Sequence, residues 1–177
     1  MFIAQAIRMP IVRTRGYAHH VEIAAPVERV WQALTHAPTI VRWYADRATV
    51  EPRVGGRFFV ERNERGARDA QIDIFEPNRR LRLVYLKMPG APPSDSALVD
   101  DFLLDSRGPA TVLRVLGSGV PDTPDWDPLY MRLRLGWPIL FKQLRLLLEP
   151  AGADQAGADA KEGSKKGPQK DNTPRSR

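Results

Sequence analysis

Cysteine is absent from this chain of 177 residues. Disulfide bonds, thiol catalysis and thiolate metal sites are therefore excluded. Long apolar runs are lacking too, because no stretch approaches the roughly 18–20 residues that a membrane-spanning helix needs. We accordingly expect no membrane span, and a cytoplasmic location agrees with this composition.

Histidine is scarce, and the three histidines show no metal-binding pattern. His19 and His20 are adjacent in an alternating segment, so they would point to opposite faces of a strand, and His36 follows a short helix. A metal site needs three or four converging ligands. The serines lie outside any nucleophile elbow, and no glycine-rich phosphate loop occurs. We therefore expect no metal, no cofactor and no dedicated catalytic constellation.

Positive charge exceeds negative charge only modestly, with 27 Lys and Arg against 21 Asp and Glu, for a net charge of +6. The acidic residues are interspersed with the basic ones. A nucleic-acid-binding domain more often gathers its positive charge into a stripe with aromatic residues between. We therefore expect no specific nucleic-acid partner.

The two ends of the chain differ from its middle. Residues 151–177 contain no aromatic or branched aliphatic side chain, so they cannot bury enough apolar surface to offset the entropy of ordering. We predict a disordered basic tail over 150–177 and a loosely packed N-terminal extension over 1–14. Residues 15–149 remain, which is the length of one domain.

The longest helical pattern covers residues 125–149. Apolar side chains recur there with the i, i+3, i+4, i+7 spacing of one helix face, at Trp137, Leu140, Phe141, Leu144, Leu147 and Leu148. Asp125 is the expected N-cap, and Pro138 is expected to kink or split the helix. We expect this helix to pack along a sheet and the space between them to be the functional feature.

The preceding residues read as short strands. Residues 17–23 alternate as a half-buried strand, and two short helical segments follow over 27–35 and 39–44. Alternation and turn residues then predict about six strands, over 48–54, 57–61, 67–75, 79–87, 97–105 and 111–116. Residues 117–123 lead into the long helix. This order predicts an α+β fold with an antiparallel sheet.

Five segments, in this order, resemble the START-like or SRPBCC superfamily. They are residues 23–35, Trp43, residues 54–58, residues 76–81, and residues 136–138 with Leu140 and Leu144. The resemblance covers residues 17–148 and is to the branch named after the C-terminal domain of the activator of the heat-shock-protein-90 ATPase. It implies a helix-grip fold, in which a curved antiparallel sheet of about six to seven strands surrounds the long C-terminal helix and a hydrophobic cavity separates them.

The resemblance has one clear departure. Related sequences often carry His-Ser-Gly-Phe after the last strand, whereas this chain has Gly117-Ser118-Gly119-Val120. The change removes an imidazole and an aromatic ring from the end of the implied cavity. Any chemistry that depends on those two groups is therefore not expected here.

The helix-grip fold makes the apolar residues of the domain candidates for a cavity wall, although the same residues could equally form a packed core. The candidate ligand-binding residues are Trp43, Phe58, Leu83, Tyr85, Asp100, Phe102, Leu104, Leu113, Trp126, Tyr130, Gly136, Trp137, Leu140 and Phe141. The proline-rich segment 88–96 is long for a hairpin connection and is a candidate lid.

Asp100 is the one candidate for chemistry. It alternates with Leu98, Phe102 and Leu104, so it shares their face if the strand keeps this phase. A desolvated carboxyl group has a raised pKa and would serve as a proton acceptor or ligand anchor. If the phase slips by one residue, Asp100 points to solvent, and we favour that simpler interpretation. The superfamily pattern has an apolar residue near this position, which makes the aspartate unusual without proving a function.

Three functions follow, in this order of preference. The first is non-catalytic binding of a small hydrophobic molecule, with a stress-related role in keeping with many members of the superfamily. The second is a cochaperone-like interaction module with a protein partner such as a chaperone. The third is a cyclase- or hydrolase-type enzyme that uses Asp100 or Tyr130 as acid or base. We expect a monomer or weak dimer, because nothing in the sequence demands a larger assembly.

Overall fold

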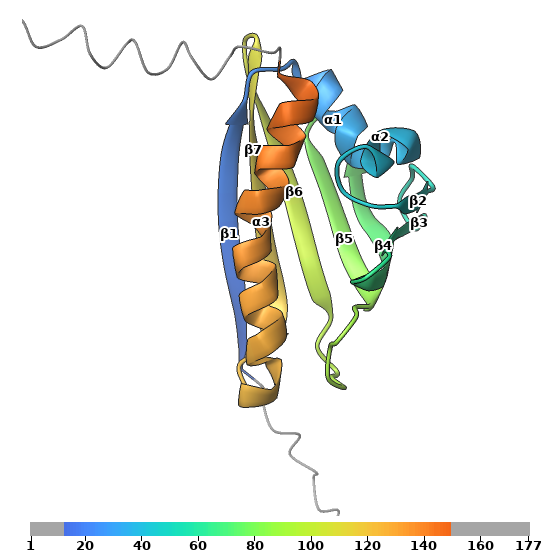
Figure 1. Cartoon of the computed structure of the whole chain (residues 1–177), viewed down its shortest axis with the longest axis vertical. Coiled ribbons are helices and arrows are strands. Elements are labelled where there is room, and N and C mark those ends of the chain that lie inside the picture. Colours follow the sequence, from blue (N-terminus) through green and yellow to red (C-terminus); the bar gives the residue numbers. More distant parts are fainter. Residues whose placement is uncertain (1–12, 150–177) are drawn as a thin grey trace, which may run out of the picture.

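The computed structural model describes residues 13–149 and consists of one antiparallel sheet with helices on its inner side (Figure 1). In chain order the elements are β1 (Thr14–Ile23), α1 (Val27–Thr35), α2 (Ala37–Val41), β2 (Arg47–Val50), β3 (Arg57–Arg62), β4 (Gly66–Glu76), β5 (Arg80–Lys87), β6 (Leu98–Arg107), β7 (Ala110–Pro121), η1 (Pro124–Trp126) and α3 (Asp127–Leu148). This is the predicted α+β helix-grip architecture.

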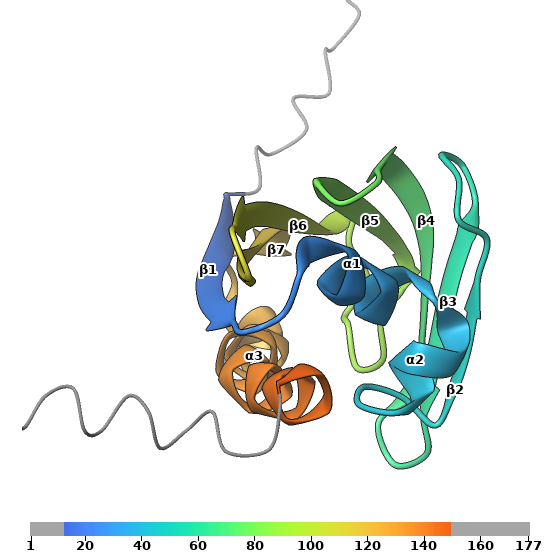
Figure 2. The same cartoon turned by 90° about the horizontal axis from the view of Figure 1, so that it is seen from above.

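The sheet has seven strands in the order β1-β7-β6-β5-β4-β3-β2. Strands β2 to β7 each pair with their sequence neighbours, mostly through short turns such as the one at Asn78, where φ is 61°, although residues 88–97 form a longer loop between β5 and β6. Only β1 pairs at a distance, beside β7, with Thr14 opposite Pro121 and Ile23 opposite Thr111. Seen from above, the sheet curves, and α1 and α3 lie on the inner side of the curve (Figure 2).

The long helix α3 buries one face against the sheet, as its spacing predicted. Trp137, Leu140, Phe141, Leu144 and Leu148 are buried, together with Leu129 and Leu133 nearer its start, and Leu147 is half-buried against the core. The helix runs without interruption from Asp127 to Leu148, so the expected split at Pro138 does not occur. Pro138 is exposed, which lets water reach the carbonyl group that the proline leaves without a donor.

The start of this helix was predicted wrongly. Asp125 lies in the short 3₁₀ helix η1, α3 begins two residues later at Asp127, and the residue before it, Trp126, makes no capping bond through its side chain. Asp127 and Pro128 do occupy the first turn, where a negative charge and a missing N–H group are favourable.

Strand β7 is longer than its alternation predicted. It continues to Pro121, whereas residues 117–123 were expected to form a connection. Gly117 and Gly119 hid the alternation, because a glycine carries no side chain to mark a face. The extension pairs with the start of β1, which begins at Thr14 rather than residue 17.

Other boundaries moved by two or more residues as well, since β6 continues to Arg107 instead of residue 105 and the second helix ends at Val41 instead of residue 44. Strand β2 ends at Val50 instead of residue 54, because the chain turns before Gly55 and Gly56. The second helix, Ala37–Val41, begins directly after His36, two residues before its predicted start at residue 39.

The core fills the space between the curved sheet and the helices. Side chains from α1 (Val30), β4 (Ile72), β5 (Leu83), β7 (Leu113) and α3 (Leu144) are almost wholly buried. No helix within residues 13–149 is long and apolar enough to cross a membrane. The predicted tail lies outside the described residues, as does the predicted N-terminal extension apart from residues 13 and 14.

Candidate functional site

The most unusual group in the core is the carboxylate of Asp100 on β6, which has no solvent exposure. The Tyr17 hydroxyl donates to its Oδ1 atom at 2.5 Å, and the Tyr85 hydroxyl donates to its Oδ2 atom at 2.7 Å. Each carboxylate oxygen therefore has one phenolic donor. The alternative in which Asp100 points to solvent, which the sequence favoured, is wrong.

The neighbouring strands explain why Tyr17 reaches Asp100. Tyr17 on β1 is paired with Gly117 on β7, and Gly117 is paired in turn with Asp100 on β6. Because Gly117 has no side chain, the Tyr17 ring occupies the space where a Cβ atom would stand. The ring thus passes over β7 and brings its hydroxyl to the carboxylate.

The next residue, Asp101, lies on the outer face of the sheet in the opposite kind of environment. Arg80 donates to its two carboxylate oxygens at 2.9 and 2.6 Å, and Arg82 donates to Oδ2 at 3.1 and 2.8 Å. Burial works against the ionised form, but these hydrogen bonds outweigh it, so the pKa of Asp101 lies below its usual value. The two adjacent aspartates therefore have opposite environments.

Burial raises the pKa of Asp100, although the hydrogen bonds from Tyr17 and Tyr85 and the charge of Arg68 oppose the shift. Burial also raises the pKa of both tyrosines, and the charge of Asp100 adds to that effect. Both phenols therefore stay protonated and keep donating. The cluster can hold or release a proton at Asp100 while its tyrosines remain neutral.

This arrangement predicts how stability varies with pH. Because the pKa of Asp100 is raised on folding, its contribution to stability is fully present below the unfolded value of about 4 and is lost as the pH rises through the folded value. Asp100→Asn removes the ionisation, so the free energy of unfolding of this variant should rise relative to that of the wild type as the pH increases above about 4. Urea unfolding at a series of pH values measures the difference.

Asp101→Asn is the matched control, and its sign is opposite. The pKa of Asp101 is lowered on folding, so its contribution is present above the unfolded value and is lost as the pH falls through the folded value. The variant should be less stable than the wild type at neutral pH, and the gap should close in acid. Parallel pH profiles for the two variants would contradict the assignment.

An inner space lies beside this cluster, with a volume of about 20 Å³. Its wall is formed by Leu34, Ile40, Trp43, Tyr44, Phe58, Leu81, Leu83, Tyr85, Phe102 and Trp137. The Phe102 and Trp137 rings meet edge to face with centroids 5.4 Å apart. Such a volume has room for about one water molecule, so the centre of the core is almost completely packed.

A larger outer pocket of about 110 Å³ opens between α3 and the β3–β4 hairpin. Its lining residues are Arg62, Arg65, Gly66, Arg68, Met88, Pro89, Arg132, Leu133, Gly136, Trp137, Ile139, Leu140 and Gln143. Trp137 belongs to both walls and therefore separates the two spaces. A Cβ atom added at Gly136 would meet nothing within 4 Å, so the helix leaves this part of the pocket open.

The candidate lid forms part of the outer pocket. Met88 and Pro89, at its start, line the pocket. The guanidinium group of Arg132 on α3 donates to the Pro89 carbonyl at 2.5 Å. This contact ties the loop between β5 and β6 to the helix across the pocket mouth.

The structure gathers the predicted cavity residues into two groups. Trp43, Phe58, Leu83, Tyr85, Phe102 and Trp137 surround the inner space, and Gly136, Trp137 and Leu140 line the outer pocket. Asp100, Leu104, Leu113, Trp126, Tyr130 and Phe141 line neither space. Leu104 and Leu113 are buried opposite one another on β6 and β7.

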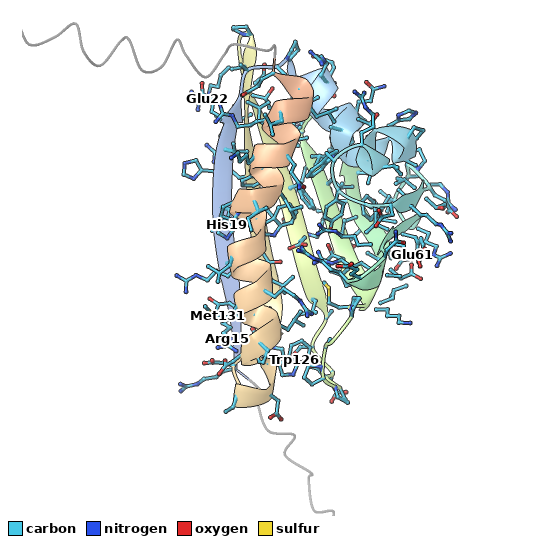
Figure 3. The ribbon with its side chains drawn as sticks, in the orientation of Figure 1. Arg15, His19, Glu22, Glu61, Trp126 and Met131 are labelled. Atoms are coloured by element: carbon cyan, nitrogen blue, oxygen red, sulfur yellow. The ribbon has the colours of Figure 1, made fainter. Side chains whose placement is uncertain are left out.

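Trp126 ends η1 and Tyr130 lies in the first turn of α3, and Figure 3 labels Trp126 at this end of the helix. The Tyr130 hydroxyl donates to the Gly16 carbonyl at 3.2 Å, and the Arg15 guanidinium lies 4.2 Å from the Tyr130 ring centroid. Phe141 borders a separate depression beside Val21. These positions do not bring Tyr130 to Asp100 as a joint acid and base.

The arginines of the outer pocket and Tyr17 were not recognised from the sequence. The alternation of the strands contained this information. On β4, Arg68 alternates with the inward residues Ala70 and Ile72 and therefore shares their face. On β1, Tyr17 shares the inward face of Ile23 in the same way. His19 is half-buried on that inward face and His20 is exposed, as alternation predicted. Within residues 13–149 no three metal-ligating side chains converge.

A curved antiparallel sheet folded around a long C-terminal helix, with two short helices after the first strand, places this chain in the helix-grip class of the SRPBCC superfamily. A family model described as activator of Hsp90 ATPase homolog 1-like protein matches residues 24–149. The chain belongs to that family. No curated protein matches it.

Solved structures agree with this assignment. A crystal structure of a Mesorhizobium loti protein is 30% identical, with a TM-score of 0.66 over 75% of this chain and 96% of its own. The Aha1 dimer from Colwellia psychrerythraea is 21% identical, with a TM-score of 0.67 over 78% of this chain and 98% of its own. An HSP90 activator from Plasmodium falciparum is 17% identical, with a TM-score of 0.64 over 75% and 94%. The last two likenesses show the fold alone.

Proposed function

We propose that this protein binds a small, mainly apolar molecule in the outer pocket, without catalysing its conversion. The observation that supports this most is the pocket itself, which leaves about 110 Å³ between α3 and the sheet. Leu133, Trp137 and Leu140 give it apolar walls, and arginines give it polar groups at one side. Apolar walls with a few placed polar groups are typical of small-molecule sites.

The volume limits the size of the ligand. A cavity of about 150 Å³ accommodates benzene, so the outer pocket fits a molecule of about one ring or a short chain. The inner space adds only about 20 Å³. To extend inward, a larger molecule would have to displace Trp137, which lines both spaces.

The environment of Asp100 does not support an enzymatic function. Its two oxygens are occupied by the Tyr17 and Tyr85 hydroxyls, and it lines neither space. A general acid or base must come within hydrogen-bonding reach of the reacting group. We therefore assign the cluster to the support of the core behind the pocket.

Gly136→Leu tests the proposal. The added side chain enters the open part of the pocket, because a Cβ there meets nothing within 4 Å, so binding should be lost while the fold is kept. Single-ring compounds, neutral and charged, are titrated while the indole N–H signals are followed by NMR, with Trp137 expected to shift most. The matched control is Leu135→Gln, on the exposed neighbour, which should bind as the wild type does. No binding tighter than about 1 mM, which is about −4 kcal/mol, would contradict the proposal.

A second candidate function rests on the outer face of α3. Met131, Leu135, Ile139 and Leu146 are 44%, 59%, 65% and 70% exposed and form an apolar stripe along the helix. Such a stripe is typical of a protein-interaction surface, and the similar Colwellia protein is a dimer. If association is the function, Leu135→Glu should abolish it in sedimentation velocity runs and leave small-molecule binding unchanged.

A further inference from the structure

We infer that the ligand of the outer pocket carries an anionic oxygen group, such as a carboxylate or phosphate, which Arg62, Arg65 and Arg68 bind together. This inference rests on the proposed function of the same pocket and specifies the chemistry of its occupant. The ligand is thus a small amphipathic acid, with its apolar part against α3 and its charged group toward the β3–β4 hairpin.

The charge of the pocket wall is one-sided. Four of its lining residues are arginines, namely Arg62, Arg65, Arg68 and Arg132, and none of the lining residues is acidic. Elsewhere on the sheet, arginines are matched with acids. Arg57, for example, pairs with Asp69 at 2.7 Å, and Arg80 pairs with Asp101 at 2.6 Å.

None of the four pocket arginines forms an ion pair with a carboxylate of residues 13–149. Arg68 donates to the Tyr44 hydroxyl at 2.9 Å, Arg62 lies 5.7 Å from the Tyr44 ring centroid, and Arg132 holds the Pro89 carbonyl. Asp100 and Asp46 act on Arg68 and Arg62 electrostatically, but neither lines the pocket. The guanidinium groups therefore retain capacity for a further acceptor.

The hairpin explains why the arginines converge. Arg62 ends β3 on the same face as Phe58 and Val60, and Arg68 on β4 is paired with Val60. Gly66, opposite Arg62, adds no side chain between them. Arg65 lies in the connecting turn, so three positive charges gather at one end of the pocket.

This grouping has a cost without a ligand. Burial lowers the pKa of Arg62, and the nearby charges of Arg65 and Arg68 lower it further. An anion in the pocket would offset this repulsion, and planar guanidinium groups bind carboxylates and phosphates through paired hydrogen bonds. A neutral hydroxyl in the same place accepts a weaker hydrogen bond and does not offset the positive charge.

The test compares two probes with one apolar body. Benzoate and benzyl alcohol differ in the carboxylate, and each is titrated into the full chain by calorimetry and by NMR of the indole signals. We expect the acid to bind at least about tenfold more tightly and to weaken with added salt, as exposed charge pairs do. Phenyl phosphate, with inorganic phosphate as its control, distinguishes a phosphate group from a carboxylate.

Arginine variants locate the anion. Arg62→Gln and Arg65→Gln should reduce acid binding about tenfold each and leave alcohol binding unchanged. Arg134→Gln is the matched control, because Arg134 is exposed on α3 outside the pocket and its loss changes the net charge equally. Arg65 is exposed, so its variant should fold even if the Arg62 variant does not.

The outcomes separate this inference from the proposed function. Equal binding of acid and alcohol, or equal effects of Arg65→Gln and Arg134→Gln, overturns the anionic ligand and leaves the binding function in place. Binding of neither probe overturns both. Preference for the acid that is lost only in the pocket variants supports both.

Discussion

Gly117→Ala is expected to destabilise the protein by about 3 kcal/mol, a large fraction of the stability of a domain this size. The new methyl group would overlap the ring of Tyr17, which is buried and cannot swing into solvent. Overpacking of this kind costs about 1–3 kcal/mol. The displaced hydroxyl would also leave Asp100, and an unsatisfied buried acceptor costs about 1–3 kcal/mol more.

A double-mutant cycle isolates the cause. If the clash with Tyr17 is the reason, Gly117→Ala should cost much less in a Tyr17→Ala background than in the wild type. Urea unfolding of the four proteins gives the coupling free energy. Simple additivity of the two substitutions would show that Gly117 is needed for another reason.

Leu144→Ala is expected to cost about 2–5 kcal/mol, the range for truncating a buried leucine. Leu144 lies on the buried face of α3 and has no solvent exposure. The matched control is Leu146→Ala two residues along the same helix, where the side chain is 70% exposed and the change should stay within about 0.5 kcal/mol. Similar losses for the two variants in urea unfolding would mean that α3 packs in another orientation.

The spacing of apolar residues along the sequence predicted most of the fold. The i, i+3, i+4 spacing around Leu140 and Leu144 identified the buried face of α3, and period-two alternation identified the strands of the sheet. The errors occurred where side chains carried no pattern, as at Gly117 and Gly119 in β7, or where helix ends are set by backbone geometry, as at Asp125. Pairing with the distant strand β1 extended β7, and such pairing cannot be read from local residue types.

The candidate site was harder to predict for a physical reason. Aromatic residues such as Phe58 and Trp137 serve equally as core and as pocket wall, so their positions alone do not reveal an open space. Arginines are usually solvated, so Arg62 and Arg68 looked like ordinary surface residues. Only the curvature of the sheet brings the hairpin that carries them against α3.

The structure explains why this chain departs from the superfamily pattern at Gly117. The absent imidazole is not simply a lost group, because the space is taken by the ring of Tyr17 from another strand. The hydroxyl of that ring then satisfies a carboxylate that would otherwise be buried with a single donor, Tyr85. Gly117, Tyr17 and Asp100 are therefore best understood as one compensated set.

The placement of β1 at the edge beside β7 also determines the order in which the protein can fold. Strands β2 to β7 pair between sequence neighbours, and such local pairs close quickly, least so β5 with β6 across the longer loop of residues 88–97. Strand β1 has no partner until the chain has been synthesised as far as β7, since Thr14 is paired with Pro121. Until then the outer edge of the growing sheet stays unpaired, and an unpaired edge invites pairing with another chain. The first strand of the described chain can thus join the sheet only after the last strand has been made, and it then covers β7 and becomes the edge itself.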